Sequence, residues 1–406
     1  MGSEGLGRNF NRLWAAVAIS NLGDGLRLVG FPLLAVTITR HPGLVAGLTV
    51  ALRLPWLLFS IPAGELADRL DRRRLMAFVS GIQGAVMGLF GLSVWVVGPR
   101  LPLLFLAAFI LGIGEVTFDT VAQTLIPATV DHQHLERANG RLIATERIIN
   151  ELAGPPMGSA LFAAFAAAPF VADAVTFVIA AALILTITGT FKASGASTGS
   201  APPRRMLDGL RWVWSHRFFR SLTIFGAVWN FMGGAVSGIL VLFSLETLRT
   251  GGVGFGLLMA AAAVGGIAGA LLAPALEDRL GPGTVMLSAA ALQGLAYGVA
   301  GLLSSPWWAG AILATAQVGF FAALVVLFSL RQALVPDHLL GRVTAAMRVV
   351  AAGALPIGAA LGGLISSLFG LRAPFLMAAA GFLVVTILGA PRINNARIAR
   401  QFETTA

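Results

Sequence analysis

The sequence contains no cysteine and few charged residues. The absence of cysteine from all 406 residues excludes disulfide bonds and thiolate chemistry. Only 11% of the residues are charged, whereas 57% are hydrophobic and the mean hydropathy is +0.85. This composition excludes a soluble globular domain and indicates a membrane protein. A phosphate-binding Gly-Lys-Ser/Thr signature is also missing, which argues against ATP as the energy source.

Basic residues outnumber acidic ones, 28 to 18, but they lie in short gaps between apolar runs. They do not form the basic face of a nucleic-acid-binding domain, so no nucleic acid partner is expected. His132 and His134 have a spacing that could suit a metal ion. Because no cysteine or third ligand accompanies them, we expect solvated loop residues and no metal site.

Twelve apolar runs are each long enough for a helix of about 20 residues that crosses a bilayer. The expected fold is therefore an all-α membrane protein with 12 transmembrane helices in two pseudo-symmetric six-helix bundles. The predicted spans are 13–39, 43–63, 75–97, 101–127, 139–167, 169–190, 219–247, 252–276, 284–303, 306–335, 340–369 and 372–390.

The two halves of the chain repeat each other. GRLIATERII at 140–149 returns as GRVTAAMRVV at 341–350, and QTLIP at 123–127 returns as QALVP at 332–336. Parallel repeats in a membrane protein place a substrate path where the halves meet, which is typical of transporters. The predicted domains are an N-terminal six-helix bundle at 1–190, a cytoplasmic linker with an amphipathic helix at 191–218, a C-terminal six-helix bundle at 219–391 and a cytoplasmic tail at 392–406.

Arginine is concentrated in the gaps on one side of the predicted spans, so the positive-inside rule places both termini in the cytoplasm of a multi-pass protein of the cell (inner or plasma) membrane. The stretch 193–203 is small, polar and Pro-containing, which predicts a flexible linker. The stretch 206–219 sets Trp and Phe beside Arg and His. It predicts a helix on the membrane surface or, alternatively, the start of span 7.

The stretch GELADRLDRRR at 64–74 resembles the cytoplasmic loop signature of the major facilitator superfamily. NLGDG at 21–25 and the Pro-Phe, Asp-Ala and Phe pattern at 169–177 resemble the branch that includes the enterobactin exporter and the macrolide- and tetracycline-type efflux pumps. The resemblance covers essentially the whole chain. Asp71 stands where the superfamily commonly has Gly, and span 4 lacks the arginine that many proton-coupled members carry.

The loop chemistry suggests a conformational latch. Asp68 ends span 2, where a carboxylate can meet the positive end of a helix in the other half. The resemblance implies that Arg72 pairs with an acid near the ends of spans 4 and 5, and alternatively the arginines serve only topology. The acids available for this pair are Asp131, Glu136 and Glu146, and the predicted latch residues are Gly64, Asp68, Arg69, Arg72 and Arg73.

Span 5 carries Gly154, Pro155 and Gly158, which resemble the proline-glycine signature of exporters in this superfamily. Ser159 replaces the second glycine of that signature. Proline bends a helix, and the small residues admit a neighbouring helix closely. Export is therefore favoured over import.

Charged side chains at the centre of a span are costly, so they usually face water, pair with each other or move protons. Glu115 and Asp119 lie four apart in span 4 and share one helical face. Two carboxylates in a low dielectric tend to share a proton. We expect them to form the proton-coupling site, with Asp24 next. Alternatively, Asp24 forms a static ion pair with Arg27, three residues later.

Arg147 and Glu151 lie four apart in span 5 and are also candidates for proton coupling or for a static ion pair. Asp173 follows Pro169 by four residues. We expect it to stabilise the start of span 6.

The predicted function is a secondary active transporter, not an enzyme, that exports an amphipathic organic compound such as a drug or siderophore by proton antiport and alternating access. The proton gradient supplies the energy, no cofactor is expected, and the transporter is expected to be a monomer in contact with membrane lipid. Alternatives are a lipid or lysolipid translocator and, more remotely, a polytopic membrane enzyme or scaffold. The family implies a cavity lined by spans 1, 4, 7 and 10, with candidate contacts Asn21, Arg27, Trp229, Asn230, Phe231, Gln317 and Phe320.

Overall fold

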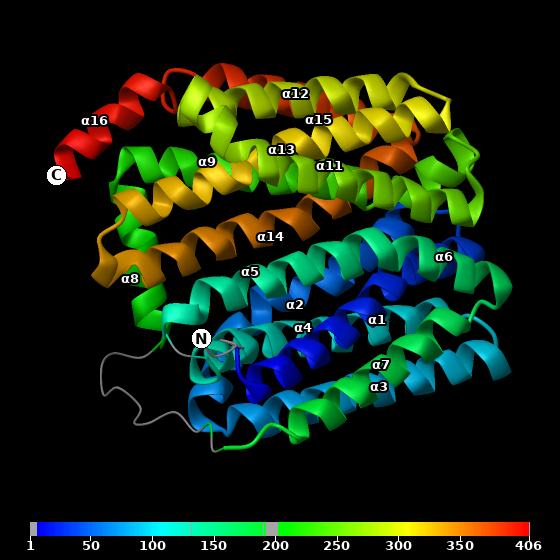
Figure 1. The fold of residues 1–406 in the computed structure, drawn as a ribbon. Coiled ribbons are helices and arrows are strands. Elements are labelled where there is room, and N and C mark those ends of the chain that lie inside the picture. Colours follow the sequence, from blue (N-terminus) through cyan, green and yellow to red (C-terminus); the bar gives the residue numbers. More distant parts are fainter. Residues whose placement is uncertain (1–5, 131, 190, 192–201, 406) are drawn as a thin grey trace. The chain divides into compact units, whose positions relative to one another are not determined.

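The computed structural model describes residues 6–130, 132–189, 191 and 202–405, and all regular structure in these ranges is helical. The all-α prediction is confirmed for this part of the chain (Figure 1). Eight of its helices are long and apolar enough to cross a membrane. A ninth span results if α9 (Arg217–Ser237) and the segment Leu240–Thr247, which meet at a bend of 43°, are counted together. The eight are α2 (Pro42–Arg69), α3 (Arg72–Val96), α4 (Leu101–Leu125), α7 (Ala168–Leu185), α11 (Gly251–Leu280), α12 (Pro282–Leu302), α13 (Pro306–Leu334) and α14 (Asp337–Phe369).

Three predicted spans have a different character. Helix α1 (Arg8–Ile38) carries Arg12, Asp24 and Arg27. Predicted span 5 is divided into α5 (Leu135–Thr145), the π-helix η3 (Glu146–Ala153) and α6 (Gly154–Ala164). Helix α15 (Ala373–Gly389) is apolar but only 17 residues long. Charge or shortness thus separates these segments from the clearly apolar helices, and the count of twelve spans stays a prediction.

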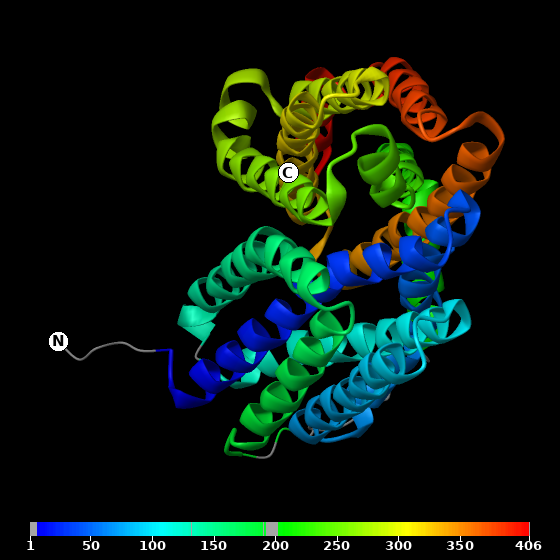
Figure 2. The same cartoon turned by 90° about the vertical axis from the view of Figure 1, so that its right-hand side faces the viewer.

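The chain forms two compact units. The first unit comprises residues 1–39, 54–199 and 252–260. Within it α1 packs against α6, α7 and η3, and α3 packs against α4 and α7. Figures 1 and 2 show α3 and α7 lying side by side along most of their length.

The second unit comprises residues 40–53, 200–251 and 261–406. Helix α9 (Arg217–Ser237) packs against α14 and α15, and α12 packs against α13 and α15. The short α10 (Leu240–Leu242) and the π-helix η4 (Phe243–Thr247) follow α9. Each unit therefore contains a corresponding set of helix pairs, as expected from the sequence repeat.

Glycines allow the closest helix approaches in both units. A Cβ atom on Gly25 of α1 would lie 2.8 Å from the Cα atom of Gly154 in α6, and one on Gly158 would lie 2.5 Å from the backbone oxygen of Leu26. In the second unit, a Cβ atom on Gly358 of α14 would overlap the backbone of Phe231 in α9. Only glycine fits at such positions, so small residues bring the backbones of these helices into contact.

The linker region contains a separate helix. Residues 193–201 of the predicted flexible linker 193–203 lie outside the described residues. Helix α8 (Pro202–Ser215) follows, and His216 in extended conformation separates it from α9. The stretch 206–219 is therefore not merely the start of span 7, although its place on a membrane surface stays a prediction. The tail forms α16 (Asn395–Thr405), where Asn395 accepts a hydrogen bond from the backbone of Gly283 at 2.8 Å.

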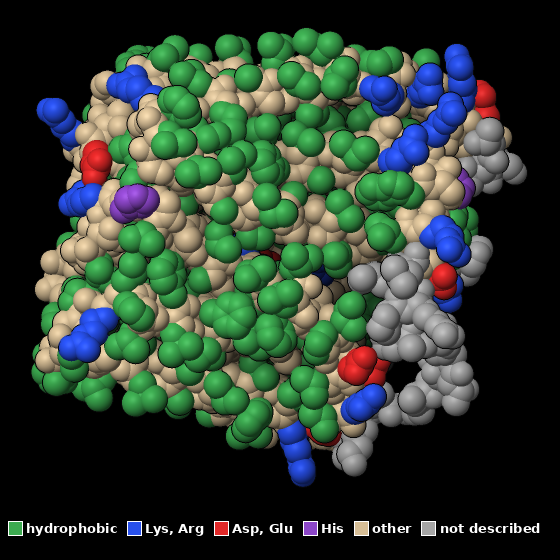
Figure 3. All heavy atoms as spheres, turned by 180° about the vertical axis from the view of Figure 1, so that it is seen from behind, with side chains coloured by type: hydrophobic (Ala, Val, Ile, Leu, Met, Phe, Trp, Pro, Cys, Tyr) green, Lys and Arg blue, Asp and Glu red, His purple; other side chains and the backbone are tan. Residues whose placement is uncertain are grey.

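The surface is apolar where a bilayer would contact it. Large apolar side chains are more than half exposed on several helices, for example Leu89 at 68%, Leu271 at 76% and Trp307 at 85%. On the face shown in Figure 3, hydrophobic side chains cover the middle and Lys or Arg side chains lie mainly towards the edges. Exposed apolar surface of this extent is stable only against lipid or another apolar partner, so the chain is a multi-pass membrane protein.

Candidate functional site

A buried arginine lies at the centre of the polar residues in the first unit. Arg27 of α1 is only 6% exposed. Its Nη2 atom lies 2.5 Å from Asp24 Oδ1 and 3.9 Å from Glu115 Oε2 on α4, and its Nε atom lies 3.3 Å from Asp173 Oδ2 on α7. Carboxyl groups from three helices thus surround one guanidinium group.

Two glycines of α1 make this arrangement possible. A Cβ atom on Gly23 would overlap the side chains of Asp173 and Thr176, and one on Gly25 would clash with the backbone of Asn150 and Gly154. Asp24 stands between these glycines. The Gly-Asp-Gly segment therefore places a carboxylate on α1 while α7 and α6 approach the same turn.

A cavity of about 130 Å³ lies beside this cluster within the first unit. Asn21, Asp24, Glu115 and Asp119 of the predicted site residues line it together. Glu146 and Asn150 line it from the π-helix η3, and the Asn150 side chain donates a hydrogen bond to Asn21 Oδ1 at 3.5 Å. π-Helical segments occur frequently at functional sites because they displace side chains from the regular helical register. The other lining residues are Val17, Ser20, Gln83, Phe118 and Phe177.

Asp173 belongs to this cluster, which was not expected from its place in the sequence. Its side chain is fully buried and contacts Arg27, and it lies beyond the first turn of α7, so the expected role at the start of that helix is replaced by a contact with α1. An acid in the middle of an apolar run could have been matched with Arg27 on grounds of charge alone.

Arg147 and Glu151 form an ion pair with each other on η3. Their side chains are 29% and 30% exposed, and neither lines the cavity described above. This geometry corresponds to the static ion pair that the sequence analysis gave as the alternative to proton coupling.

The predicted latch residues lie at the end of α2 and the start of α3, on either side of the two residues that join these helices. Asp68 is exposed at the end of α2, and Arg69 lies 3.8 Å from Glu65. Arg72 donates a hydrogen bond to the carbonyl oxygen of Thr124 at 3.2 Å, and Arg73 donates one to that of Ile187 at 2.5 Å. Both arginines thus bind carbonyl groups at or near the C-terminal ends of helices, where cations are favoured.

The acids proposed to pair with Arg72 lie elsewhere or are not described. Glu146 lines the cavity, Glu136 is exposed on α5, and Asp131 lies outside the described residues. No described atom stands within 4 Å of a Cβ atom built on Gly64, so this glycine allows no close approach in the first unit.

Asp71 has a clear local role. It caps the N-terminus of α3, because its Oδ1 atom accepts a hydrogen bond from the backbone of Arg74 at 3.0 Å and its Oδ2 atom accepts one from Phe191 at 3.3 Å. Partial burial opposes ionisation, but these two hydrogen bonds and the charges of Arg73 and Arg74 outweigh it and lower the pKa of Asp71. The departure from the family's usual glycine thus supplies a helix cap.

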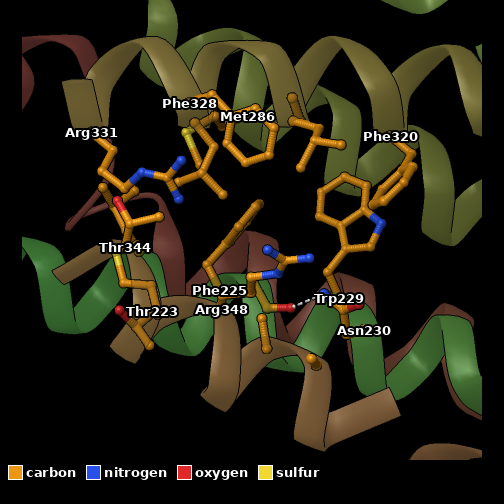
Figure 4. Close-up of a pocket in the computed structure, with 18 residues that line it drawn as sticks. Thr223, Phe225, Trp229, Asn230, Met286, Phe320, Phe328, Arg331, Thr344 and Arg348 are labelled. Carbon is orange, nitrogen blue, oxygen red and sulfur yellow. Dashed lines mark hydrogen bonds between the residues drawn. The ribbon is translucent and has the colours of Figure 1, made fainter. Parts of the chain in front are cut away.

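A second cavity, of about 400 Å³, lies within the second unit between α9, α13 and α14. Figure 4 shows Phe225, Trp229 and Phe320 around it, with the guanidinium groups of Arg331 and Arg348 projecting into it. The Arg331 guanidinium lies 4.8 Å from the centre of the Phe328 ring, within cation–π range. No Asp or Glu of the described chain lines this cavity.

Part of this cavity matches the residues predicted to contact the substrate. Trp229, Asn230 and Phe320 line it, whereas Phe231 and Gln317 do not. Arg331 and Arg348 were missed as cavity residues. Arg331 lies near the end of its predicted span, where topology readily explains it, whereas Arg348 lies inside its span and repeats Arg147, a signal that could have found it.

The two units differ in charge at equivalent positions. In the repeat, Gly233 corresponds to Asp24, and the Phe170–Phe177 and Phe375–Phe382 stretches place Ala378 opposite Asp173. The first unit therefore holds acids at these two positions, of which Asp173 is fully buried, where the second holds small residues. No group of three His, Cys, Asp or Glu side chains in the described ranges could hold a metal ion.

Comparison with known proteins agrees with this architecture. The model of the family described as transmembrane secretion effector matches residues 7–398. The chain is 27% identical to the multidrug efflux pump Tap of Mycobacterium tuberculosis over 91% of both chains, and 26% identical to the enterobactin exporter EntS of Citrobacter koseri over 93% of this chain and 90% of the exporter.

Solved transporter structures share the fold. A mutant of the nucleoside transporter NupG superposes with a TM-score of 0.79 at 12% identity, covering 95% of this chain and 100% of NupG. A bacterial homologue of the human lysosomal transporter Spinster, in its inward-facing and occupied conformation, gives a TM-score of 0.75 at 16% identity, covering 98% and 97% of the two chains. The chain belongs to the transmembrane secretion effector family of the major facilitator superfamily, and it is a membrane transporter and not an enzyme.

Proposed function

We propose that this transporter exports an amphipathic organic compound in exchange for protons, by alternating access. It would act as a monomer in the cell membrane with both termini in the cytoplasm, and it would draw on the proton gradient without a cofactor. The names of the efflux and exporter relatives and the proline-glycine signature of α6 support export over import.

The observation that carries the coupling proposal is the surplus of carboxyl groups around Arg27. One guanidinium group can neutralise one carboxylate, yet three lie within 3.9 Å of it. An uncompensated carboxylate in a low-dielectric site is costly. The surplus groups are therefore expected to bind protons when water is excluded and to release them when it enters.

Glu115 is the member best placed to exchange protons. Its side chain is 28% exposed and lines the cavity, whereas Asp173 is fully buried. Asp24 and Asp119 line the same cavity and can receive the proton next. We assign Arg27 and Asp173 to holding the cluster together, and Arg147 with Glu151 to stabilising η3.

The cavity of the second unit is the proposed contact for the substrate body. Its volume of about 400 Å³ and its aromatic lining suit a bulky amphipathic compound. Arg331 and Arg348 can bind an acceptor or anionic group on that compound.

The test uses purified protein in liposomes with an imposed pH gradient. Uptake of tetracycline and of the dye Hoechst 33342 is followed together with internal pH, reported by pyranine. The parent should couple movement of at least one probe to proton movement, and Glu115→Gln should abolish the coupled proton flux while retaining binding of that probe. Glu403→Gln, which removes an exposed acid of the tail helix α16, is the matched control and should behave like the parent.

Glu151→Gln separates coupling from structure. It leaves Arg147 without its ion-pair partner, so it should lower thermal stability and expression while the folded fraction still moves protons. Proton flux in Glu115→Gln, Asp119→Asn and Asp24→Asn equal to that of the parent would refute coupling through this cluster.

A further inference from the structure

A strongly basic pocket lies at one end of the second unit, apart from both cavities described above. Its volume is about 600 Å³, and four arginines line it: Arg217 and Arg220 from the first turn of α9, Arg392 from the segment after α15, and Arg397 from α16. No acidic residue of the described chain lines it. The pocket therefore concentrates positive charge without an internal counter-ion.

An apolar groove of about 520 Å³ adjoins this pocket between α9 and α15. The pocket and the groove share Arg220, Ser221 and Arg392. The rest of the groove lining is apolar, and several of its side chains are substantially exposed, among them Ile224 at 48%, Val384 at 52% and Leu388 at 57%. A basic site thus continues directly into an apolar surface along two membrane helices.

We propose that this composite site binds an anionic phospholipid, with its phosphate on the arginines and an acyl chain in the groove. One guanidinium group can donate two parallel hydrogen bonds to two oxygens of one phosphate. This geometry favours arginine over lysine at phosphate sites. A free phosphate would use only the basic pocket and would leave the groove without a role. The lipid is the ligand class that matches both parts.

The predicted topology agrees with this assignment. The positive-inside rule places the arginine-rich ends of α9 and α15 on the cytoplasmic side, and the cytoplasmic leaflet carries the anionic lipids that attract basic segments. The basic pocket shares no lining residue with the second-unit cavity, and the groove shares only the buried Phe225 with it. The lipid is therefore a structural ligand that holds α9 against α15, and its binding does not depend on the proposed transport reaction.

The experiment measures lipid-dependent stability of the full-length protein in detergent micelles. Thermal unfolding is followed by tryptophan fluorescence while phosphatidylglycerol, phosphatidylcholine with the same acyl chains, or glycerol 3-phosphate is titrated in. Phosphatidylglycerol should raise Tm by several degrees, and the other two should not. Native mass spectrometry of the same samples should retain phosphatidylglycerol in preference to phosphatidylcholine.

Variants assign the effect to the site. Arg220→Gln combined with Arg397→Gln should raise the mole fraction of phosphatidylglycerol needed for half of the Tm shift, roughly fivefold for each arginine removed. Val384→Ser should weaken the lipid effect by removing part of the groove wall. Arg279→Gln removes an exposed arginine outside the site and should leave the titration unchanged.

Three results would overturn the proposal. Equal stabilisation by phosphatidylcholine would show a general lipid effect, and equal stabilisation by glycerol 3-phosphate would show a phosphate site without a lipid chain. An unchanged titration in the double variant would place the lipid elsewhere. If that variant fails to accumulate, Arg397→Gln alone decides, since this exposed side chain lies on the tail helix.

Discussion

Arg27 Nε on α1 lies 3.3 Å from Asp173 Oδ2 on α7, and both side chains are almost entirely buried. The contact ties the first and sixth predicted spans together where neither side chain can reach bulk water. Removing one charge from such a contact leaves the other in a medium that solvates it poorly.

Arg27→Leu is therefore expected to destabilise the protein strongly, by about 3–5 kcal/mol, because three carboxyl groups lose their cation. Asp173→Asn should lower the free energy of unfolding much less, since Arg27 keeps its ion pair with Asp24. Combining the two changes should recover part of the loss. Thermal unfolding in detergent gives the order of the three variants, and a double variant no more stable than Arg27→Leu would contradict the pairing.

Asp68→Asn should impair transport in the liposome assay without a comparable loss of stability, because the exposed carboxylate makes no packing contact in the first unit. Exposed substitutions of this kind usually change the free energy of unfolding by no more than about 0.5 kcal/mol. Asp278→Asn, the repeat counterpart in α11, is the matched control. Full transport by Asp68→Asn at normal expression would remove the latch from the mechanism.

Gly25→Ala should lower the free energy of unfolding by roughly 1–3 kcal/mol, since the new Cβ atom would lie 2.6 Å from the backbone oxygen of Asn150 and force α1 away from η3. Gly81→Ala is the control, because no described atom lies within 4 Å of its Cβ position and alanine favours the helix. Chemical unfolding should rank Gly25→Ala below the parent and Gly81→Ala at or above it. Equal stability of both variants would show that α1 does not need the glycine.

The helix cap formed by Asp71 should make the stability of the folded protein depend on pH. Its lowered pKa means that the ionised cap stabilises the folded state at pH values above the unfolded pKa of about 3.9, and that this contribution is lost as the pH falls through the lower folded pKa. Asp71→Asn keeps an acceptor for the cap but removes the charge. The Tm difference between parent and variant should be present at pH 7 and vanish in acid, and a constant difference would contradict a role for the charge.

Interactions along one helix could be predicted from the sequence. The Arg147–Glu151 pair needs only the spacing of four residues, and the apolar runs define most helices within a few residues. The pairing of Arg27 with Asp173 depends on how α1 and α7 are rotated about their axes, which Gly23 determines through a close approach. The spacing of residues along one helix does not show how that helix is rotated against another.

The second-unit cavity shows the same limit. Trp229 and Phe320 could be predicted because their helices are expected to line the path, but Gln317, one turn from Phe320, does not line the cavity. Residues three apart share a helical face, so the cavity ends along α13 between Gln317 and Phe320, and sequence spacing does not show where it ends. Similarly, the predicted continuous span 139–167 gave no sign of the π-helix η3, which presents Glu146 and Asn150 to the first-unit cavity.

The glycine crossings suggest how the two halves diverged after duplication. Gly25 of α1 and Gly234 of α9 both press against a neighbouring backbone, while the residue just before each is Asp24 in one half and Gly233 in the other. The close backbone contacts at these glycines thus stayed the same in both halves, while the positions next to them changed independently. One copy could acquire ionisable groups and the other aromatic ones without either having to evolve a new way to pack.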